Sequence, residues 1–379
     1  MPCSPQYVMS NGKPMWPIIQ QSLVRLQQLS AARSVTYRDL ESPPLLRIGS
    51  NRSLTMSQLQ AASLLACAFF CLFPYRSDQA QSKEYENFPN PNFNRLYKSG
   101  SPAKIEKLKC ILHYFRRITE KTPNGVISFR RYKLPDDSHP QWLNSRQVLC
   151  NLHLTTGKKI EDIDCVLQGG GVLGSGCVQE EIRFSICPEM LVSLLVCEMM
   201  KPDECIFLIG CERYSSYKGY ANNFEFDNDY RDDTPKDNWG RKWCHLVAMD
   251  AIYFRNPSIQ YDMKYINREL IKAYTCFRLR KVATIHQTLF GIATGNWGCG
   301  AFNAIIQLMA ASEARRPLIY AAFGDKNLVN LFFTVYDHLT QQQATVRDLY
   351  LYLLQYSDKH SRLSLFDYIL RTSVKSLRP

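Results

Sequence analysis

Apolar residues recur at three- and four-residue spacing through the first third of the chain, which is the pattern of helices with one buried face. The ranges with this pattern are 16–32, 55–73 and 102–121. Thr55 is the expected N-cap of the second helix, and Pro74 is expected to end it. The first third is therefore predicted to be helical.

From Gly125 onward, short apolar runs alternate with helical patterns. The predicted strands are 126–129, 148–154, 163–167, 205–209, 245–254, 282–293 and 318–323. The predicted helices are 189–200, 261–279, 303–314, 328–339, 345–356 and 363–374. This alternation favours an α/β layered sheet whose ligand binds beyond the strand ends. We expect a helical accessory region over residues 1–121 and an α/β region with C-terminal helices over 122–379.

Composition narrows the class of protein. Hydrophobic residues make up 45% of the chain and charged residues 21%, which is typical of a folded globular protein. The formal net charge of +12 favours a polyanionic partner, such as nucleic acid or another phosphate polymer, although a generally basic surface explains it equally well. The 14 cysteines form no Cys-x-x-Cys pair and show no disulfide-framework spacing, so we expect buried thiols in a reducing compartment and no metal site.

Other segments carry simpler expectations. The first residues lack the pattern of a secretory signal, and the longest apolar run, 61–73, is shorter than the ~20 residues that span a bilayer. We therefore expect a soluble intracellular protein with no membrane partner. The acidic run Glu225–Asp237 is predicted to be a solvated loop without a bound metal.

A glycine-dense loop that leads into two adjacent carboxylates is the strongest sign of chemistry. Three consecutive glycines, 169–171, let backbone N–H groups approach phosphate oxygens, and Glu180 and Glu181 follow. Glycoside hydrolysis uses a carboxyl group as proton donor. Adjacent residues face opposite sides of a strand or diverge by ~100° on a helix, so at most one of the two is the donor. The other would bind a sugar hydroxyl or orient the first, and Asp162 or Asp164 could supply a third acid.

A second glycine-rich turn, 294–302, follows an apolar strand and precedes a predicted helix, so it could hold a diphosphate at the helix N-terminus. Three tyrosines, Tyr214, Tyr217 and Tyr220, follow another strand. Their rings could stack on a nucleobase or take part in ordinary packing. Phe323, after the strand 318–323, could close the other side of such a pocket.

These motifs give the sequence a resemblance to the metazoan poly(ADP-ribose) glycohydrolase family, whose signature is three glycines followed closely by Gln-Glu-Glu. Gly169, Gly170 and Gly171 match the first part, and Gln179, Glu180 and Glu181 match the second. Further similar segments are 2–5, 55–58, 92–96, 114–117, 217–220 and 295–302.

The resemblance implies a macrodomain-like three-layer α/β/α core with a helical N-terminal region. It also implies hydrolysis of ribose–ribose O-glycosidic bonds of poly(ADP-ribose), with release of ADP-ribose and no cofactor. Glu181 would protonate the leaving ribose hydroxyl and later activate water, Glu180 would bind ribose hydroxyls, and Asp162 would support the site. The implied partners are poly(ADP-ribose) and poly(ADP-ribosyl)ated proteins, in the nucleus and cytoplasm, during ADP-ribosylation turnover and the DNA-damage response.

The resemblance also assigns substrate contacts. Gln179 and Tyr220 would meet the adenosine end, with Tyr220 stacking on adenine and Phe323 lining the pocket, while 296–301 would hold the diphosphate. The full set is Gly169, Gly170, Gly171, Gln179, Tyr220, Asn296, Trp297, Gly298, Cys299, Gly300, Ala301, Phe323, Ile160, Glu161 and Cys165.

The chain departs from the family pattern at two points. Cys165 occupies the position of a ribose-binding asparagine, and Phe302 is followed directly by Asn303 where the family has a Gly-Gly pair. Two hypotheses follow: an active glycohydrolase, or a catalytically impaired paralogue that binds ADP-ribose. Nucleic-acid binding by charge alone is the weakest reading, because no recognition motif is present, and sequence-specific binding is not expected.

Overall fold

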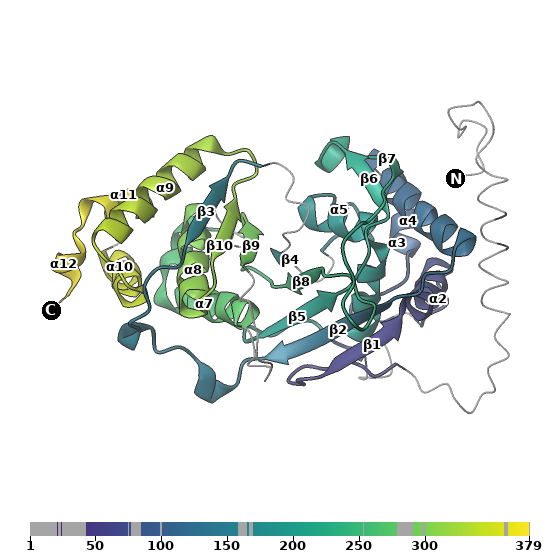
Figure 1. Ribbon diagram of the computed structural model, residues 1–379, viewed down its shortest axis with the longest axis horizontal. Helices are drawn as coiled ribbons and strands as arrows, with labels where there is room; N and C mark the ends of the chain where they lie inside the picture. The colour runs from purple at the N-terminus through teal and green to yellow at the C-terminus, as the bar shows by residue number, and fades with distance from the viewer. Residues whose placement is uncertain are drawn as a thin grey trace.

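The computed structural model describes most of the chain from residue 43 onward. The described residues are 43–74, 76, 85–98, 101–157, 165–166, 170–252, 254–278, 291–297, 300–359 and 363–378, with residues 21 and 24. Figure 1 shows helices α2 and α4 at one end of the molecule, strands through its middle, and the C-terminal helices at the other end. The predicted helix 16–32 falls almost entirely outside the described residues.

The first described helix begins later than its sequence pattern predicts. α2 (Gln58–Phe69) starts after Ser57, whose hydroxyl accepts a hydrogen bond from the Gln60 N–H while the Gln60 side chain accepts one from the Ser57 N–H. Residues Ser53–Ser57 form strand β1 instead. The prediction of Thr55 as N-cap is therefore wrong. Pro74 does not end the helix either, because α2 stops at Phe69.

A five-stranded sheet lies beside these helices, in the order β1-β2-β5-β8-β4. Its other strands are β2 (Val126–Lys133), β5 (Glu204–Ile209), β8 (His245–Ala248) and β4 (Cys165–Val166). β1, β2, β5 and β8 pair antiparallel in turn, and β4 pairs parallel with β8. Because β1 belongs to the first third of the chain, that region contributes an edge strand to the sheet as well as helices.

A second sheet is wholly parallel. Its order is β3 (Leu152–Thr155), β10 (Leu318–Ala321) and β9 (Ile292–Gly295). A separate antiparallel hairpin consists of β6 (Ser215–Lys218) and β7 (Glu225–Asp229). β7 corrects the prediction of a continuous loop over Glu225–Asp237. The predicted strands 205–209 and 318–323 are confirmed with small changes of boundary, and the strand predicted over 126–129 extends to Lys133 as β2. β3 overlaps only the end of the predicted range 148–154 and ends one residue beyond it, and β8 occupies only the start of 245–254. Most of the predicted strand 282–293 lies outside the described residues.

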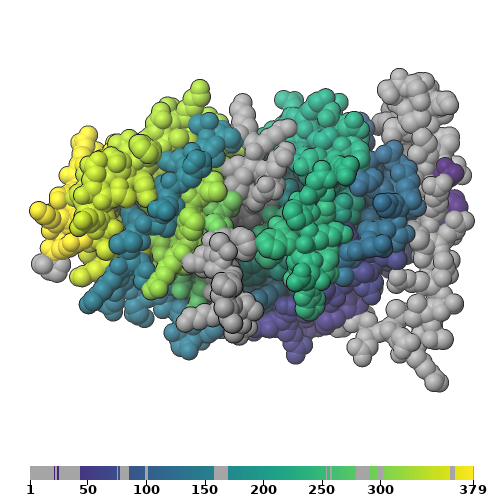
Figure 2. Space-filling view, viewed as in Figure 1, coloured from purple at the N-terminus to yellow at the C-terminus, as the bar shows by residue number. Residues whose placement is uncertain are grey.

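Helices pack on both sheets. α4 (Pro102–Glu120) buries a stripe of side chains that includes Ala103, Cys110, Tyr114 and Ile118. The later helices are α7 (Met263–Phe277), α8 (Gly300–Glu313), α9 (Lys326–Gln341) and α10 (Val346–Lys359), which confirm four predictions. The predicted helix 363–374 divides into α11 (Leu365–Arg371) and α12 (Val374–Leu377). The space-filling view places the C-terminal helices at one end and the α4 segment toward the other (Figure 2).

The segment between the glycine loop and β5 differs from its prediction. The helix expected over 189–200 is absent; a 3-10 turn (Pro188–Val192) and a single helical turn, α6 (Ser193–Val196), occupy it. These residues are buried on every side, and a continuous apolar run of this kind does not distinguish a helix from an irregular buried segment. The short helix α3 (Asn94–Tyr97) and α5 (Gln179–Ile186) complete the α-helices described, and further 3-10 turns lie at 136–138, 142–144, 221–223 and 257–261.

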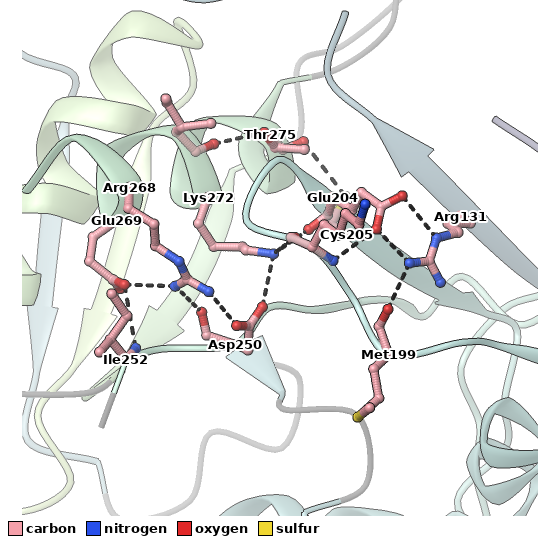
Figure 3. A network of polar contacts seen from close by, with 12 residues as sticks. Arg131, Met199, Glu204, Cys205, Asp250, Ile252, Arg268, Glu269, Lys272 and Thr275 are labelled. Carbon is pink, nitrogen blue, oxygen red and sulfur yellow. Dashed lines mark hydrogen bonds and ion pairs between the residues drawn. The ribbon is translucent and has the colours of Figure 1, made fainter. Parts of the chain in front are cut away.

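A buried polar network joins the sheet to α7 (Figure 3). Arg131 of β2 is fully buried and pairs with Glu204 of β5 at 3.1 Å (Nε to Oε1) and 2.5 Å (Nη2 to Oε2). Lys272 of α7 donates to the carbonyl oxygens of Lys201 and Glu204 and forms an ion pair with Asp250 at 2.8 Å. Arg268 also binds Asp250. Buried charges are thus paired across the strand–helix boundary.

Within the described ranges, no helix is long and apolar enough to cross a membrane. The same part of the chain contains no group of three or more His, Cys, Asp or Glu side chains arranged to hold a metal ion.

Candidate active site

The two adjacent glutamates lie in the first turn of α5. The sequence left strand and helix open, and the structure shows a helix over Gln179–Ile186. Glu181 Oε2 accepts a hydrogen bond from the N–H of Val178 at 2.9 Å, which satisfies a free donor at the helix N-terminus. Carboxylates are also favoured there by the helix dipole. The local sequence therefore both starts the helix and fixes the acids at its end.

The glycine loop closes around the carboxylate of Glu181. The Gly171 N–H donates to Glu181 Oε1 at 2.8 Å, and the side chain is only 6% exposed. A Cβ atom at Gly176 would lie 2.5 Å from this oxygen, and one at Gly170 would lie 2.6 Å from it. Gly170 also has a φ of +42°. The loop is rich in glycine because its backbone contacts the Glu181 carboxylate. The Gly171 N–H is already bound to this carboxylate.

Glu180 has a different environment from Glu181. Its side chain is half-buried, whereas that of Glu181 is buried. A Cβ atom at Gly170 would lie 3.1 Å from Glu180 Oε2, so both carboxyl groups approach the same glycine from the helix. Two carboxyl groups that share one loop but differ in exposure are suited to different tasks.

A lysine from the N-terminal region holds the other side of this loop. Lys107 of α4 is fully buried, and its ammonium group donates to the carbonyl oxygens of Val172 at 2.8 Å, Gly174 at 2.8 Å and Gly176 at 2.6 Å. Burial lowers the pKa of Lys107 to about 8, although the charges of Cys177 and Glu181 act in the opposite direction. The loop thus directs carbonyl groups toward Lys107 and N–H groups toward Glu181.

Tyr220 lies beside the start of α5. It follows β6 in the hairpin, and its ring is 37% exposed. Burial is the main cause of the raised pKa of Tyr220. The hydrogen bond from the backbone N–H of Gln179 lowers this pKa, and the charge of Glu181 raises it. Tyr220, Gln179 and Glu181 are therefore neighbours.

The second glycine-rich turn lies near Tyr220, because it contacts the residues next to Phe323. The rings of Tyr220 and Phe323 have centroids 4.8 Å apart and are tilted by 51°. Next to Phe323, the Ala322 carbonyl accepts a hydrogen bond from Asn296 Nδ2 at 3.4 Å, and Tyr320 donates its hydroxyl to Asn296 Oδ1 at 2.9 Å. The end of β9 and the end of β10 are thus joined beside the hairpin.

Helix α4 also supports the hairpin that carries Tyr220. Glu106 accepts a hydrogen bond from the N–H of Phe226 at 2.9 Å, and His113 contacts Asp229 at 2.8 Å. Burial lowers the pKa of His113, with Asp229 opposing that shift. Arg117 pairs with Asp229 at 2.6 Å. One helix therefore supports both the glycine loop and the hairpin.

Some predicted site residues cannot be placed or have other roles in the packing. Those outside the described residues are Ile160, Glu161, Asp162, Gly169, Gly298 and Cys299. Cys165 lies in β4, and Gly300 and Ala301 begin α8. The Trp297 ring is buried, and its backbone carbonyl accepts a hydrogen bond from Asn303 at 2.5 Å.

Of the three tyrosines considered for stacking, two take part in packing within the hairpin region. Tyr214 is buried and donates its hydroxyl to Glu189 at 2.8 Å. Tyr217 is half-buried and packs against Phe224 at 5.7 Å between ring centroids. Tyr220 is left as the exposed ring beside the two glutamates.

Comparison with known proteins identifies the family. Residues 139–330 match the family model described as poly(ADP-ribose) glycohydrolase, Macro domain fold, and residues 13–131 match the one described as its helical domain. The chain belongs to the poly(ADP-ribose) glycohydrolase family. The expected α/β macrodomain-like core with a helical N-terminal region is thereby confirmed.

Curated relatives in this glycohydrolase family are similar over most of the chain. A probable poly(ADP-ribose) glycohydrolase 2 of Arabidopsis thaliana is 32% identical over 368 residues, covering 80% of this chain and 69% of the relative. Poly(ADP-ribose) glycohydrolase 1 of the same plant is 31% identical, covering 86% and 74%. Poly(ADP-ribose) glycohydrolase 1 of Caenorhabditis elegans is 33% identical, covering 80% of this chain and 40% of the relative.

Lys107 is a residue of this family member's site that the sequence reasoning missed. One signal was available, because Lys107 falls within the apolar stripe of the predicted helix 102–121, four residues after Ala103 and four before Ile111. A lysine in the middle of a buried helix face needs partners to offset its desolvation. Its partners are backbone carbonyl groups, which no motif search identifies.

Proposed function

We propose that this protein hydrolyses the ribose–ribose O-glycosidic bond of poly(ADP-ribose) and releases ADP-ribose. The observation that carries the proposal is the Glu181 carboxylate, held by the N–H groups of Gly171 and Val178 beside Tyr220. Membership of the glycohydrolase family and the net charge of +12 agree with a polyanionic substrate.

In the proposed mechanism, Glu181 is the acid and then the base. The protonated carboxyl group gives its proton to the oxygen of the leaving ribose as the glycosidic C–O bond breaks. The carboxylate that remains accepts a proton from the water that attacks the sugar carbon. The N–H groups of Gly171 and Val178 fit this stage, because both donate to the carboxylate oxygens. Glu180, which is half-buried, binds ribose hydroxyl groups.

We assign the rest of the predicted set to substrate binding. Tyr220 stacks on adenine, and Phe323 lies beside Tyr220, as the contact between their two rings supports. Gln179 contacts the adenosine end. The turn 296–301 binds the diphosphate. The glycines of the loop, 169–171, contact the substrate beside Glu181, whose carboxylate occupies the Gly171 N–H. Asp162 supports the acid, and Ile160, Glu161 and Cys165 complete the contacts. We also divide the chain into a helical accessory region, residues 1–121, and a macrodomain-like catalytic region with C-terminal helices, residues 122–379.

Poly(ADP-ribosyl)ated proteins are the proposed source of the polymer. We propose that the protein acts on them in the nucleus and cytoplasm, during ADP-ribosylation turnover and the DNA-damage response. The cysteines in the described part of the chain are free thiols, which suits a reducing compartment. Imaging of the tagged chain before and after induced DNA damage tests this placement; exclusion from both compartments would contradict it.

Product analysis tests the activity. Purified protein is incubated with poly(ADP-ribose), and the products are separated by chromatography; we expect free ADP-ribose. Glu181→Gln should abolish turnover while ADP-ribose still binds in calorimetry. Absence of ADP-ribose release by the wild type, together with measurable ADP-ribose binding, would identify the impaired paralogue instead. Turnover retained in Glu181→Gln would remove Glu181 from the acid role.

A further inference from the structure

The contact between Lys107 and the glycine loop uses every donor of the lysine. The ammonium group has three N–H bonds, and it binds three carbonyl oxygens of the loop, at residues 172, 174 and 176, within 2.8 Å. The side chain is fully buried, so its charge is costly unless it is well compensated. Hydrogen bonds from a charged donor are among the strongest in proteins. The lysine and the loop therefore fix one another.

The residues held by Lys107 are those that seat Glu181. Val172 follows Gly171, whose N–H binds Glu181 Oε1. The carbonyl of Gly176 binds Lys107, while the Cα side of the same glycine faces Glu181 so closely that a Cβ atom would lie 2.9 Å from the carboxyl carbon. The Gly174 N–H also closes a turn onto the Gly171 carbonyl at 2.8 Å. A displacement of the loop carbonyl groups that bind Lys107 therefore also displaces the loop N–H group that binds Glu181.

We propose that Lys107 is a positioning residue for the hydrolytic reaction, through which helix α4 holds the glycine loop in the form that orients the Glu181 carboxyl group. This inference rests on the proposed glycohydrolase function. It gives the helical N-terminal region a direct part in the reaction, because the required ammonium group comes from α4 and the acid from α5.

Lys104 offers a matched comparison on the same helix. Its side chain is also buried, 8% exposed, and also donates to backbone carbonyls, those of Arg95 at 3.2 Å and Lys98 at 3.4 Å. These carbonyls belong to α3 and its end rather than to the glycine loop. Loss of Lys104 removes a buried lysine and its hydrogen bonds while leaving the contacts of the loop in place.

The pH dependence provides a readout that a purely structural role would not give. Burial lowers the pKa of Lys107 to about 8; the neighbouring charges of Cys177 and Glu181 raise it and that of Lys104 lowers it. A neutral amine has two N–H donors for three carbonyls, so the loop loses one hydrogen bond as pH rises through this value. This titration does not destabilise the folded state. Above about pH 8 the unfolded lysine still holds its proton while the folded one loses it, so the free energy of unfolding rises with pH.

The experiment compares Lys107→Met, Lys107→Arg and Lys104→Met in the full chain. We expect Lys107→Met to lower kcat about 10- to 100-fold with little change in KM, as for a misplaced catalytic group. Lys107→Arg should recover part of kcat, because guanidinium also donates to several carbonyls. Lys104→Met should keep the wild-type kcat even where its unfolding temperature falls as much as that of Lys107→Met.

The wild-type rate is then measured from pH 6 to pH 10, with circular dichroism at each pH. We expect kcat to fall above about pH 8 without unfolding, and Lys107→Arg, which stays charged, to lack this decline. The positioning role would be overturned if wild type and Lys107→Arg had equal kcat values and pH profiles and if the kcat of Lys107→Met equalled that of Lys104→Met. Should Lys107→Met not fold, the wild-type and Lys107→Arg profiles decide. A wild type that releases no ADP-ribose contradicts the proposed function itself, a separate outcome.

Discussion

Tyr220 and Phe323 bring two distant parts of the chain into contact, with ring centroids 4.8 Å apart. Each residue is about one-third exposed, so part of its surface is available to a ligand. Tyr220→Ala should weaken ADP-ribose binding by about 10- to 100-fold, because base stacking contributes on the order of 1–3 kcal/mol. Tyr220→Phe keeps the ring and should retain most of the affinity. Calorimetric titration with ADP-ribose measures both, and equal affinity of Tyr220→Ala and wild type would contradict the stacking role.

Phe323 supplies an internal control for that experiment. Its backbone has a φ of +52°, a region that costs a non-glycine residue about 1–2 kcal/mol. Phe323→Gly should therefore lose affinity for ADP-ribose without a loss of unfolding temperature. Weaker binding in a variant that is no less stable separates the role of the ring from general damage to the fold.

The glycine loop gives a second prediction. Gly176→Ala would place a Cβ atom 2.5 Å from Glu181 Oε1 and 2.9 Å from Gly171 Cα, so the carboxyl group or the loop must move. We expect turnover to fall by about 100-fold, the scale of a reacting group displaced by ~1 Å. Gly174→Ala is the control in the same loop, since its Cβ would meet only the Gly171 carbonyl at 3.5 Å, an ordinary contact. Initial rates of ADP-ribose release distinguish the two; similar rates would show that the loop tolerates the added methyl group.

Sequence patterns predicted the long helices well and the short elements poorly. α4 and α7 each bury one face, so their apolar spacing is regular over three or more turns. The last three residues of β1 were predicted as the start of the helix that follows, because the buried Met56 extends the apolar pattern of α2. Segment 188–196 is buried on all sides, so its continuous apolar run predicted a helix although it fits an irregular buried segment equally well.

The candidate site was predictable where its residues are adjacent in the sequence. The glycines and Glu180–Glu181 could be identified because they follow one another closely in the sequence. The N–H groups of the glycines were expected to face phosphate, whereas the Gly171 N–H binds Glu181. Lys107 could not be identified from any motif, because it contacts backbone carbonyls more than sixty residues away. Tyr220 and Phe323 were expected on opposite sides of one pocket, and only the fold shows that their rings touch.

A buried glutamate away from the loop predicts how stability depends on pH. Glu189 accepts hydrogen bonds from Gln58, Tyr214 and the Glu212 N–H, yet burial raises its pKa from 4.5 to about 7. Between these values the folded state keeps a proton that the unfolded state releases. This stabilising contribution is therefore complete below about pH 4.5 and is lost as pH rises through about 7.

Comparison of Glu189→Gln with wild type isolates this contribution. The difference in unfolding free energy, wild type minus variant, should decrease by about 3 kcal/mol from pH 4 to pH 8, at 1.36 kcal/mol for each unit of pKa. Urea denaturation across this range measures it. Glu120→Gln is the control, since Glu120 is half-exposed and pairs only loosely with Arg116 at 3.7 Å. A difference that stays constant with pH, or increases, would contradict the raised pKa.

The buried pair Arg131–Glu204 predicts the largest loss of stability. Both side chains are almost completely buried, and Arg131 also donates to the carbonyl oxygens of Glu198 at 2.7 Å and Met199 at 2.9 Å (Figure 3). Arg131→Met leaves the Glu204 carboxylate buried without its cation, which costs about 3–5 kcal/mol. Lys133→Met, two residues along the same strand, removes only partly exposed ion pairs with Asp136 and Asp203 and should cost much less stability than Arg131→Met.

The double variant Arg131→Met/Glu204→Gln should be more stable than Arg131→Met alone. Replacing the carboxylate by a neutral amide removes the uncompensated charge, while the amide oxygen can still accept one of the hydrogen bonds now donated by the Gly49 and Lys201 N–H groups. Urea denaturation of the three variants and wild type measures each free energy. Equal losses of unfolding free energy in Arg131→Met and Lys133→Met would show that the sheet does not depend on this pair. A double variant less stable than Arg131→Met would show that the buried carboxylate stabilises the fold even without its cation.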